Sequence, residues 1–224
     1  MRGLAGFGLA ILLVPILALA LAPVEAVLAT NVVAVLIGLS EWRRITREAE
    51  RSALTICAVL VLTVLPGLWL LILTPPDIAR VLIALVALSA FAAMLFPIRP
   101  ATVPGRGATV AVGASAGVLT GFAGMPGPPV VPYYVGRAIE RGQAKASMLL
   151  IFTIAAGAGV ASGTMLDAMR WDLVWLGALL FPAVLLGNRL GNAASDRIAD
   201  RTWRVCVGLV LAGAAAASLW KALG

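Results

Sequence analysis

The feature that most constrains this chain is a glycine- and proline-rich stretch, 113–134, with the sequence GASAGVLTGFAGMPGPPVVPYY. Gly113, Gly117 and Gly121 recur every four residues, so one face of a helix here carries no side chains and another backbone can approach it closely. Three prolines at 126–129 then remove amide donors and forbid a continuous helix. The stretch therefore predicts a helix that stops at the prolines and begins again after them.

The composition places this broken helix in a membrane. The chain has 224 residues, of which 62% are hydrophobic and 12% charged, as in polytopic membrane proteins. In a bilayer, unpaired backbone is tolerated only where it is buried in protein or lines a cavity. A ligand site at the break is the natural interpretation. A proline kink in an ordinary span is the alternative, and it explains one proline better than three.

Several function classes are excluded. The chain has no histidine, which rules out the usual zinc sites and Ser–His or Cys–His catalysis. A Ser–Lys dyad is the remaining enzymatic option, but Lys145 and Lys221 fall at the ends of predicted spans. We expect no enzyme, no cofactor and no metal site.

Cys57 and Cys206 lie in separate apolar runs and are expected to be buried structural residues. The net charge of +7 is attributed to loop arginines and membrane topology, not to nucleic-acid binding.

The predicted fold class is all-α. Apolar segments are expected at 3–22, 26–40, 53–73, 81–97, 108–136, 146–164, 173–188 and 205–220, and polar connections at 41–51, 74–77, 98–107, 136–145, 166–172 and 187–204. A helix of about 20 residues crosses a hydrocarbon core of about 30 Å. The apolar segments are expected to insert by themselves, with a cleavable signal sequence at the N-terminus as the alternative.

An internal repeat relates the two halves of the chain. Gly6-Phe7 matches Gly121-Phe122, Pro15 matches Pro132, and a small hydroxyl residue follows fifteen residues after each proline, as Thr30 and Ser147. The match predicts a first membrane repeat at 1–97, a connection at 98–107, and a second repeat at 108–224.

Charge then selects a topology. If every apolar segment spans, basic residues divide almost evenly between the two sides. If 3–22 and 108–136 instead enter and leave on the same side, 13 of the 17 lysines and arginines share one face, in the connections 41–51, 98–106, 137–145 and 189–204. The positive-inside rule prefers this second arrangement, with those connections cytoplasmic. Each half then has one re-entrant broken segment plus three spans. Because three is odd, the second half is inverted, as in many secondary transporters.

With these motifs assembled, the chain resembles the TauE/SafE family of sulfite and organosulfonate exporters. The resemblance rests on two glycine-rich motifs that each run into an apolar stretch and a proline, at 3–15 and 117–132. Two departures stand out. Only five residues precede Gly6, whereas Gly121 lies fourteen positions after Gly107, and prolines interleave the glycines of the second break.

The resemblance implies a secondary transporter in the cell inner (plasma) membrane that exports a small sulfur-containing anion, bound between the two glycine breaks at the membrane midplane. An anion channel of the same architecture and a non-transporting membrane assembly factor are the alternatives. The partners implied are the anion, the lipid bilayer and a coupling ion, either proton or sodium. Dimerisation is left open. Because no aspartate or glutamate lies in the middle of an apolar segment, no proton relay can be named.

A compact oxyanion needs hydrogen-bond donors, and free amides at helix N-termini supply them. The candidate amides are those of Phe7, Gly8, Gly124, Met125 and Gly127. The neighbouring Gly6, Gly121 and Phe122 are also candidate binding residues at the two breaks. The side chains of Thr30, Asn31 and Ser147 are further candidates. For Thr30 and Ser147, packing or bonding to the preceding turn is an equal alternative. Asn31 is costlier to leave unpaired in lipid. Tyr133 and Tyr134 are candidate gates or interfacial anchors, and Arg189 is a candidate for an anion contact or for snorkelling.

Overall fold

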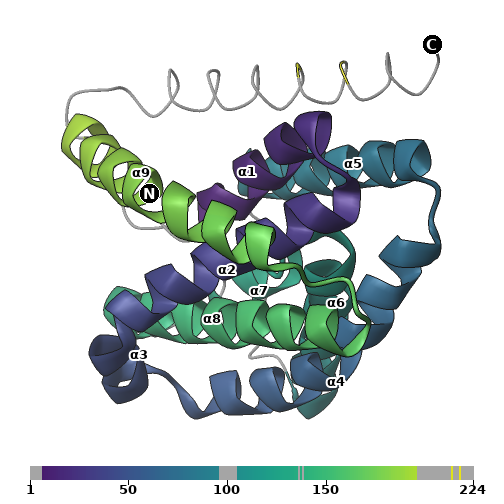
Figure 1. Cartoon of the computed structure of the whole chain (residues 1–224). Coiled ribbons are helices and arrows are strands. Elements are labelled where there is room, and N and C mark those ends of the chain that lie inside the picture. The colour runs from purple at the N-terminus through teal and green to yellow at the C-terminus, as the bar shows by residue number, and fades with distance from the viewer. Residues whose placement is uncertain are drawn as a thin grey trace.

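The computed structural model describes residues 7–95, 105–135, 137 and 139–195, together with Gly213 and Ala217. Every element in this part of the chain is a helix, which confirms the predicted fold class (Figure 1). The helices are α1 (Phe7–Ala20), α2 (Pro23–Ser40), α3 (Trp42–Glu48), α4 (Arg51–Leu73), α5 (Pro76–Leu95), α6 (Arg106–Ala123), α7 (Gly127–Val135), α8 (Arg141–Met165) and α9 (Trp171–Ser195). Three of them, at Pro23–Ser40, Arg51–Leu73 and Gly142–Met165, are long and apolar enough to cross a membrane.

The predicted break is present between α6 and α7. Gly124 follows α6 with a φ of 66°, a left-handed conformation that favours glycine. Its amide donates to the Thr120 carbonyl at 2.8 Å, and the Met125 amide donates to the Leu119 carbonyl at 3.2 Å. The first bond is that of an αL C-cap, and together the two bonds satisfy carbonyls in the last turns of α6. The glycine therefore ends α6, and the prolines that follow set the start of α7.

The glycine stripe of α6 (Gly113, Gly117 and Gly121) packs directly on the backbone of α4. A β-carbon on Gly117 would lie 2.5 Å from the Leu60 carbonyl oxygen, and one on Gly121 would lie 2.8 Å from the carbonyl carbon of Gly67. Real side chains do not tolerate such distances, so only glycine allows this approach. The predicted close helix pair is confirmed, and it holds the break at a fixed position against α4.

The polar connections are shorter than predicted because helices extend into them. The segment 41–51 contains α3, which buries Ile45 at 1% exposure. The segment 136–145 gives way to α8 at residue 141, and α9 continues to Ser195, well into the predicted loop 187–204. Arginine, glutamate and alanine favour helix, so charge alone did not mark a loop. Residues 96–104 and, apart from Gly213 and Ala217, the predicted span 205–220 lie outside the described residues, and the division into two repeats stays a prediction.

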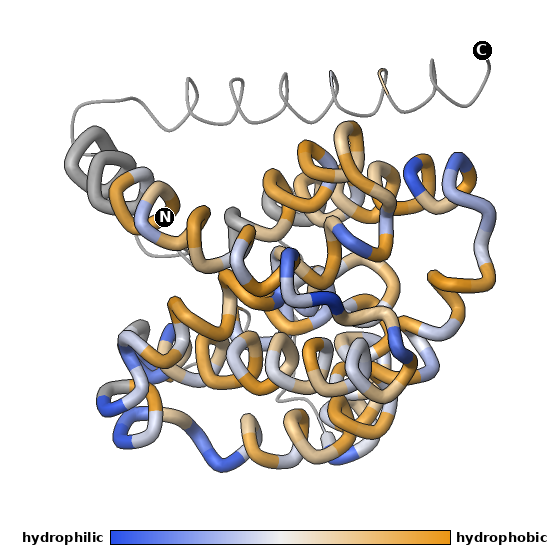
Figure 2. Tube along the Cα trace, in the orientation of Figure 1, coloured by the Kyte–Doolittle hydropathy of each residue, from blue (hydrophilic) through white to orange (hydrophobic). Residues whose placement is uncertain are grey.

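Hydropathy is distributed as a membrane protein requires. Apolar residues run along the helices, and hydrophilic residues gather at turns, above all around α3 and the start of α4 (Figure 2). Large apolar side chains such as Leu62 and Leu179 point outward, at 77% and 76% exposure. Outward apolar surface of this kind suits lipid contact. Cys57 is buried and free, as predicted, whereas Cys206 lies outside the described residues.

Candidate functional site

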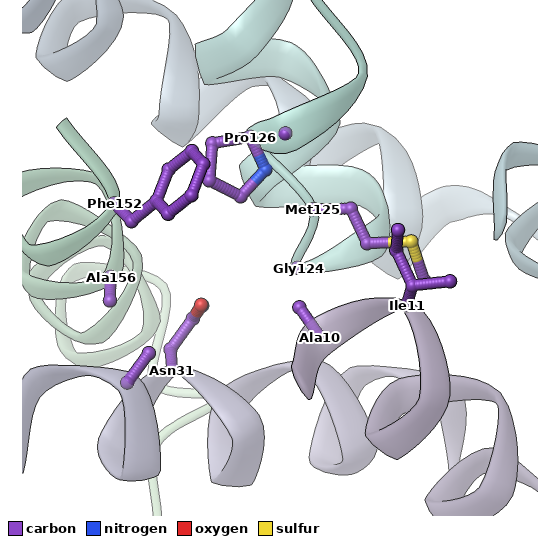
Figure 3. Close-up of a pocket in the computed structure, with 10 residues that line it drawn as sticks. Ala10, Ile11, Asn31, Gly124, Met125, Pro126, Phe152 and Ala156 are labelled. Carbon is purple, nitrogen blue, oxygen red and sulfur yellow. The ribbon is translucent and has the colours of Figure 1, made fainter. Parts of the chain in front are cut away.

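The break between α6 and α7 lines a small cavity of about 30 Å³. Its wall comes from α1, α2, the break itself, the start of α7 and α8 (Figure 3). The lining residues are Ala10, Ile11, Asn31, Ala34, Gly124, Met125, Pro126, Gly127, Phe152 and Ala156. A water molecule needs roughly 10–15 Å³ by this measure, so the cavity holds about two waters or a group of similar size.

Asn31 is the polar side chain of this cavity. It is 2% exposed, and its Nδ2 atom is the buried side-chain polar atom without a hydrogen-bond partner in the described part of the chain. Figure 3 shows its oxygen pointing from α2 into the space below Pro126 and beside Phe152. A buried amide group left unpaired costs about 1–3 kcal/mol, and such exceptions call for an explanation. Asn31 is therefore the first candidate for a ligand contact.

Small residues on α8 make room for Asn31. Its side chain lies against Gly159, where a β-carbon would sit 2.9 Å from Asn31 Cγ. Two turns of α8 contribute to the cavity wall through Phe152 and Ala156. Because α2 and α8 pack together at these positions, Asn31 is fixed against α8 and faces the break from the opposite wall.

The break offers fewer free amides than the sequence predicted. The amides of Gly124 and Met125 donate to carbonyls of α6, so the prediction that they are available to a ligand is wrong. Pro128 and Pro129 have no amide hydrogen. Gly127, the first residue of α7, has an amide for which no hydrogen bond is found among the described residues. This amide lies at a helix N-terminus, where the helix dipole favours negative charge.

The hydroxyls of Thr30 and Ser147, two of the predicted site residues, form hydrogen bonds away from the cavity. Thr30 Oγ1 donates to the Ala26 carbonyl at 2.8 Å. Ser147 Oγ donates to the Gln143 carbonyl at 2.7 Å and accepts the Glu50 amide at 2.9 Å. Neither residue lines the cavity, so the alternative of bonding to the preceding turn describes both.

Two further predicted site residues do not line the cavity. Gly121 belongs to the glycine stripe against α4, and Phe122 is buried at 8% exposure without lining the cavity. Phe7 and Gly8 form the first turn of α1, and their side chains lie outside the part of the chain that the structure describes. Gly6 lies outside the described residues. The first half instead contributes Ala10 and Ile11 of α1, which the sequence reasoning did not single out.

A second polar cluster was missed by the sequence reasoning. We call it the end network, formed by Glu50, Ser52, Thr109, Tyr133, Tyr134 and Arg137. Arg137 donates to both carboxylate oxygens of Glu50, at 2.7 and 2.6 Å, and to Ser52 Oγ at 3.1 Å. The Tyr134 and Ser52 hydroxyls lie 2.9 Å apart. Glu50 and Arg137 are 87 residues apart in sequence, so no local pattern could reveal the pair.

The end network also joins the two ends of the α6–α7 hairpin. Thr109, in the first turn of α6, and Tyr133, near the end of α7, have their hydroxyl oxygens 2.9 Å apart. The Arg137 guanidinium lies 5.2 Å from the centre of the Tyr133 ring. The chain therefore leaves α7 close to where it entered α6.

Comparison with known proteins adds the family. The model of the sulfite exporter TauE/SafE family matches residues 1–218 of the 224. No curated protein and no solved structure matches the chain. The family is one of membrane transporters and not of enzymes. A match over nearly the whole length, on a chain with apolar helices and a broken one, shows that this protein belongs to the sulfite exporter TauE/SafE family.

Proposed function

We propose that this protein is a secondary transporter that exports a small sulfur-containing anion, sulfite or an organosulfonate. The anion binds in the cavity between the α6–α7 break and α2. The Gly127 amide at the start of α7 donates to it from one side, and the Asn31 amide contacts it from the other. Gly124 and Pro126 shape the break, while the glycine stripe holds it against α4.

One observation carries this proposal. Asn31 is buried and unpartnered, and it faces the break across the cavity. Other buried hydroxyls in the described helices, such as those of Thr30 and Thr153, bond to the preceding turn of their own helix. The Asn31 oxygen faces the cavity, so a ligand that enters supplies the side chain with a hydrogen-bond partner there. This gain supports a binding role for Asn31 over a packing role.

The hydrogen bonds at the ends of the helices support a re-entrant α6–α7 hairpin. In eight simple crossings, the connections 41–51 and 137–145 would lie on opposite faces of the membrane. The Glu50–Arg137 ion pair at 2.6 Å joins these two connections directly. The Thr109–Tyr133 contact brings the start of α6 to the end of α7. We therefore propose that the hairpin enters and leaves on the cytoplasmic side, and that the two halves are inverted repeats.

Reconstitution tests the function. Radiolabelled sulfite uptake into proteoliposomes should saturate with wild-type protein, with and without an imposed pH gradient. Gly127→Leu should abolish it by filling the cavity. Gly157→Leu is the matched control, because a β-carbon at Gly157 meets no atom within 4 Å. An unsaturable flux that follows voltage would indicate a channel. Absence of flux for sulfite and organosulfonates, or normal flux through Gly127→Leu, would refute the proposal.

Cysteine labelling tests the topology. Cysteines introduced at positions 102 and 140, with Cys57 and Cys206 replaced, should react with an impermeant thiol reagent from the same side of the membrane. The re-entrant arrangement predicts that this side is the cytoplasm. Labelling of the two positions from opposite faces would refute it and restore simple crossings.

A further inference from the structure

We propose that the ion carried is a singly charged, protonated oxyanion, so that hydrogensulfite and not the sulfite dianion occupies the cavity. This inference rests on the proposed function and deepens it. It concerns the charge and protonation state of the ligand, which neither the family nor the helix arrangement assigns. Two independent features of the cavity lead to it, namely its lack of cations and the kinds of polar group it presents.

Among the residues that the structure describes, the cavity has no charge to balance a ligand. None of the ten described lining residues is ionisable. The charged side chains described on the helices around Asn31 line no part of the cavity; they are Glu25 of α2, Arg51 of α4, Asp77 and Arg80 of α5, Arg106 of α6, Lys145 of α8 and Asp172 of α9. The energy of moving an ion from water into a low-dielectric site rises with the square of its charge, so a dianion costs about four times as much as a monoanion. A site without a cation therefore selects the monoanion.

The polar groups of the cavity are of two different kinds. The Gly127 amide at the start of α7 is a donor, and it suits an anionic oxygen. The Asn31 oxygen that faces the cavity is an acceptor, as Figure 3 shows. Hydrogensulfite carries both an O–H donor and anionic oxygens, so it satisfies both groups at once. The sulfite dianion has only acceptors, and it would place a negative oxygen against the Asn31 oxygen.

This protonation state gives the proton a route that needs no relay in the protein. Hydrogensulfite forms from sulfite and one proton in the water on one side, crosses as an intact ion, and releases that proton to water on the other side. Each turnover then moves one sulfite, one proton and one net negative charge. No carboxylate among the described residues lines the cavity, and none is required.

The test is the pH dependence of the KM for sulfite uptake by the full-length protein in proteoliposomes, with protein-free liposomes as the control for passive leak. We expect the KM expressed as total sulfite to rise about tenfold per pH unit above the second pKa of sulfite, because the protonated ion is depleted. The KM expressed as hydrogensulfite should stay constant, and the maximal rate should change less than about twofold. The charge moved per sulfite should be one.

Other outcomes are equally informative. Saturable flux whose KM falls or stays level as the pH rises, or a charge of two per sulfite, would overturn the inference and leave the proposed function standing. No saturable flux at any pH would overturn both.

In Asn31→Leu, the KM for hydrogensulfite should rise by at least about tenfold, the loss expected for one polar contact. In Thr153→Val, whose hydroxyl bonds within α8, the pH profile should match the wild type. An unchanged KM in Asn31→Leu would also overturn the inference.

Discussion

The two buried polar regions of this protein differ in how completely their groups are paired. In the end network, Arg137 holds both carboxylate oxygens of Glu50, and the hydroxyls of Tyr134 and Ser52 lie within hydrogen-bond distance of each other. In the cavity, Asn31 is more deeply buried than either member of that ion pair, and its Nδ2 atom has no partner. Both regions lie on the α6–α7 hairpin, one at its open end and the other at its break.

The difference in pairing distinguishes a region that stabilises the fold from a region that binds a ligand. A paired polar cluster stabilises the fold, because each charge or hydroxyl has a partner that would be orphaned by its loss. An unpaired buried amide lowers stability, and it persists where function uses it. Substitutions in the two regions should therefore change the free energy of unfolding with opposite signs.

The largest expected effect is at the ion pair of the end network. Arg137→Gln leaves the partly buried Glu50 carboxylate without its cation, and we expect a loss of about 2–4 kcal/mol, which allows for partial solvent exposure of both groups. Denaturant unfolding in detergent micelles measures it. Exchanging the pair, as Glu50→Arg with Arg137→Glu, should recover part of the loss. If the changes in the free energy of unfolding of the two single variants sum to that of the double variant, the two residues do not couple.

The second effect has the opposite sign. Asn31→Leu keeps the number and branching of the side-chain heavy atoms and removes the unpaired amide, so we expect the protein to be about 1–2 kcal/mol more stable. The same unfolding measurement applies, with Asn31→Ala as the companion variant that leaves a void. A clear loss of stability in Asn31→Leu would mean that the amide already has a structural partner, and the contrast between the two regions would fail.

A smaller effect is expected at the rim of the end network. Tyr134→Phe removes one hydroxyl contact with Ser52, which still receives a hydrogen bond from Arg137. We expect a loss of about 1 kcal/mol, typical of one hydrogen bond. A loss as large as that of Arg137→Gln would show that the hydroxyl, and not the ion pair, organises the cluster.

The smallest effect is expected for a hydroxyl that serves only its own helix. Thr153→Val keeps the shape that packs against Gly38 and removes a bond to the Leu149 carbonyl. Because a hydroxyl bonded to a carbonyl of its own helix contributes little, we expect the free energy of unfolding to change by about 0.5 kcal/mol or less. A change beyond about 1 kcal/mol in the same denaturant unfolding measurement would place Thr153 in a wider network.

The broken helix and its glycine stripe were predictable from sequence because both depend on local chemistry. Glycine spacing and proline geometry act within one or two helical turns, and they located the break at Gly124 and the close approach to α4. Asn31 was also predictable, since an asparagine inside an apolar run is costly in lipid. The ends of α8 and α9 were not, because charged residues near a membrane surface can continue a helix as readily as end it.

The remainder of the site depends on contacts between distant residues. No sequence pattern shows that the Gly124 and Met125 amides are used by a cap, which depends on the left-handed turn at Gly124. Nothing local places Ala156 opposite the break, or joins Glu50 to Arg137. Ser147 matched Thr30 in the repeat, yet its hydroxyl serves the Glu50 amide because α8 packs beside the start of α4.

The central claim is that the cavity at the break binds the anion through Asn31. Equilibrium binding of radiolabelled sulfite to purified protein in detergent tests it most directly, with wild type, Asn31→Leu and Thr153→Val measured together. We predict saturable binding at one site per chain in wild type and Thr153→Val, and affinity lower by at least about tenfold in Asn31→Leu although that variant is the more stable protein. Equal affinity in all three proteins would contradict the claim and move the site away from the break.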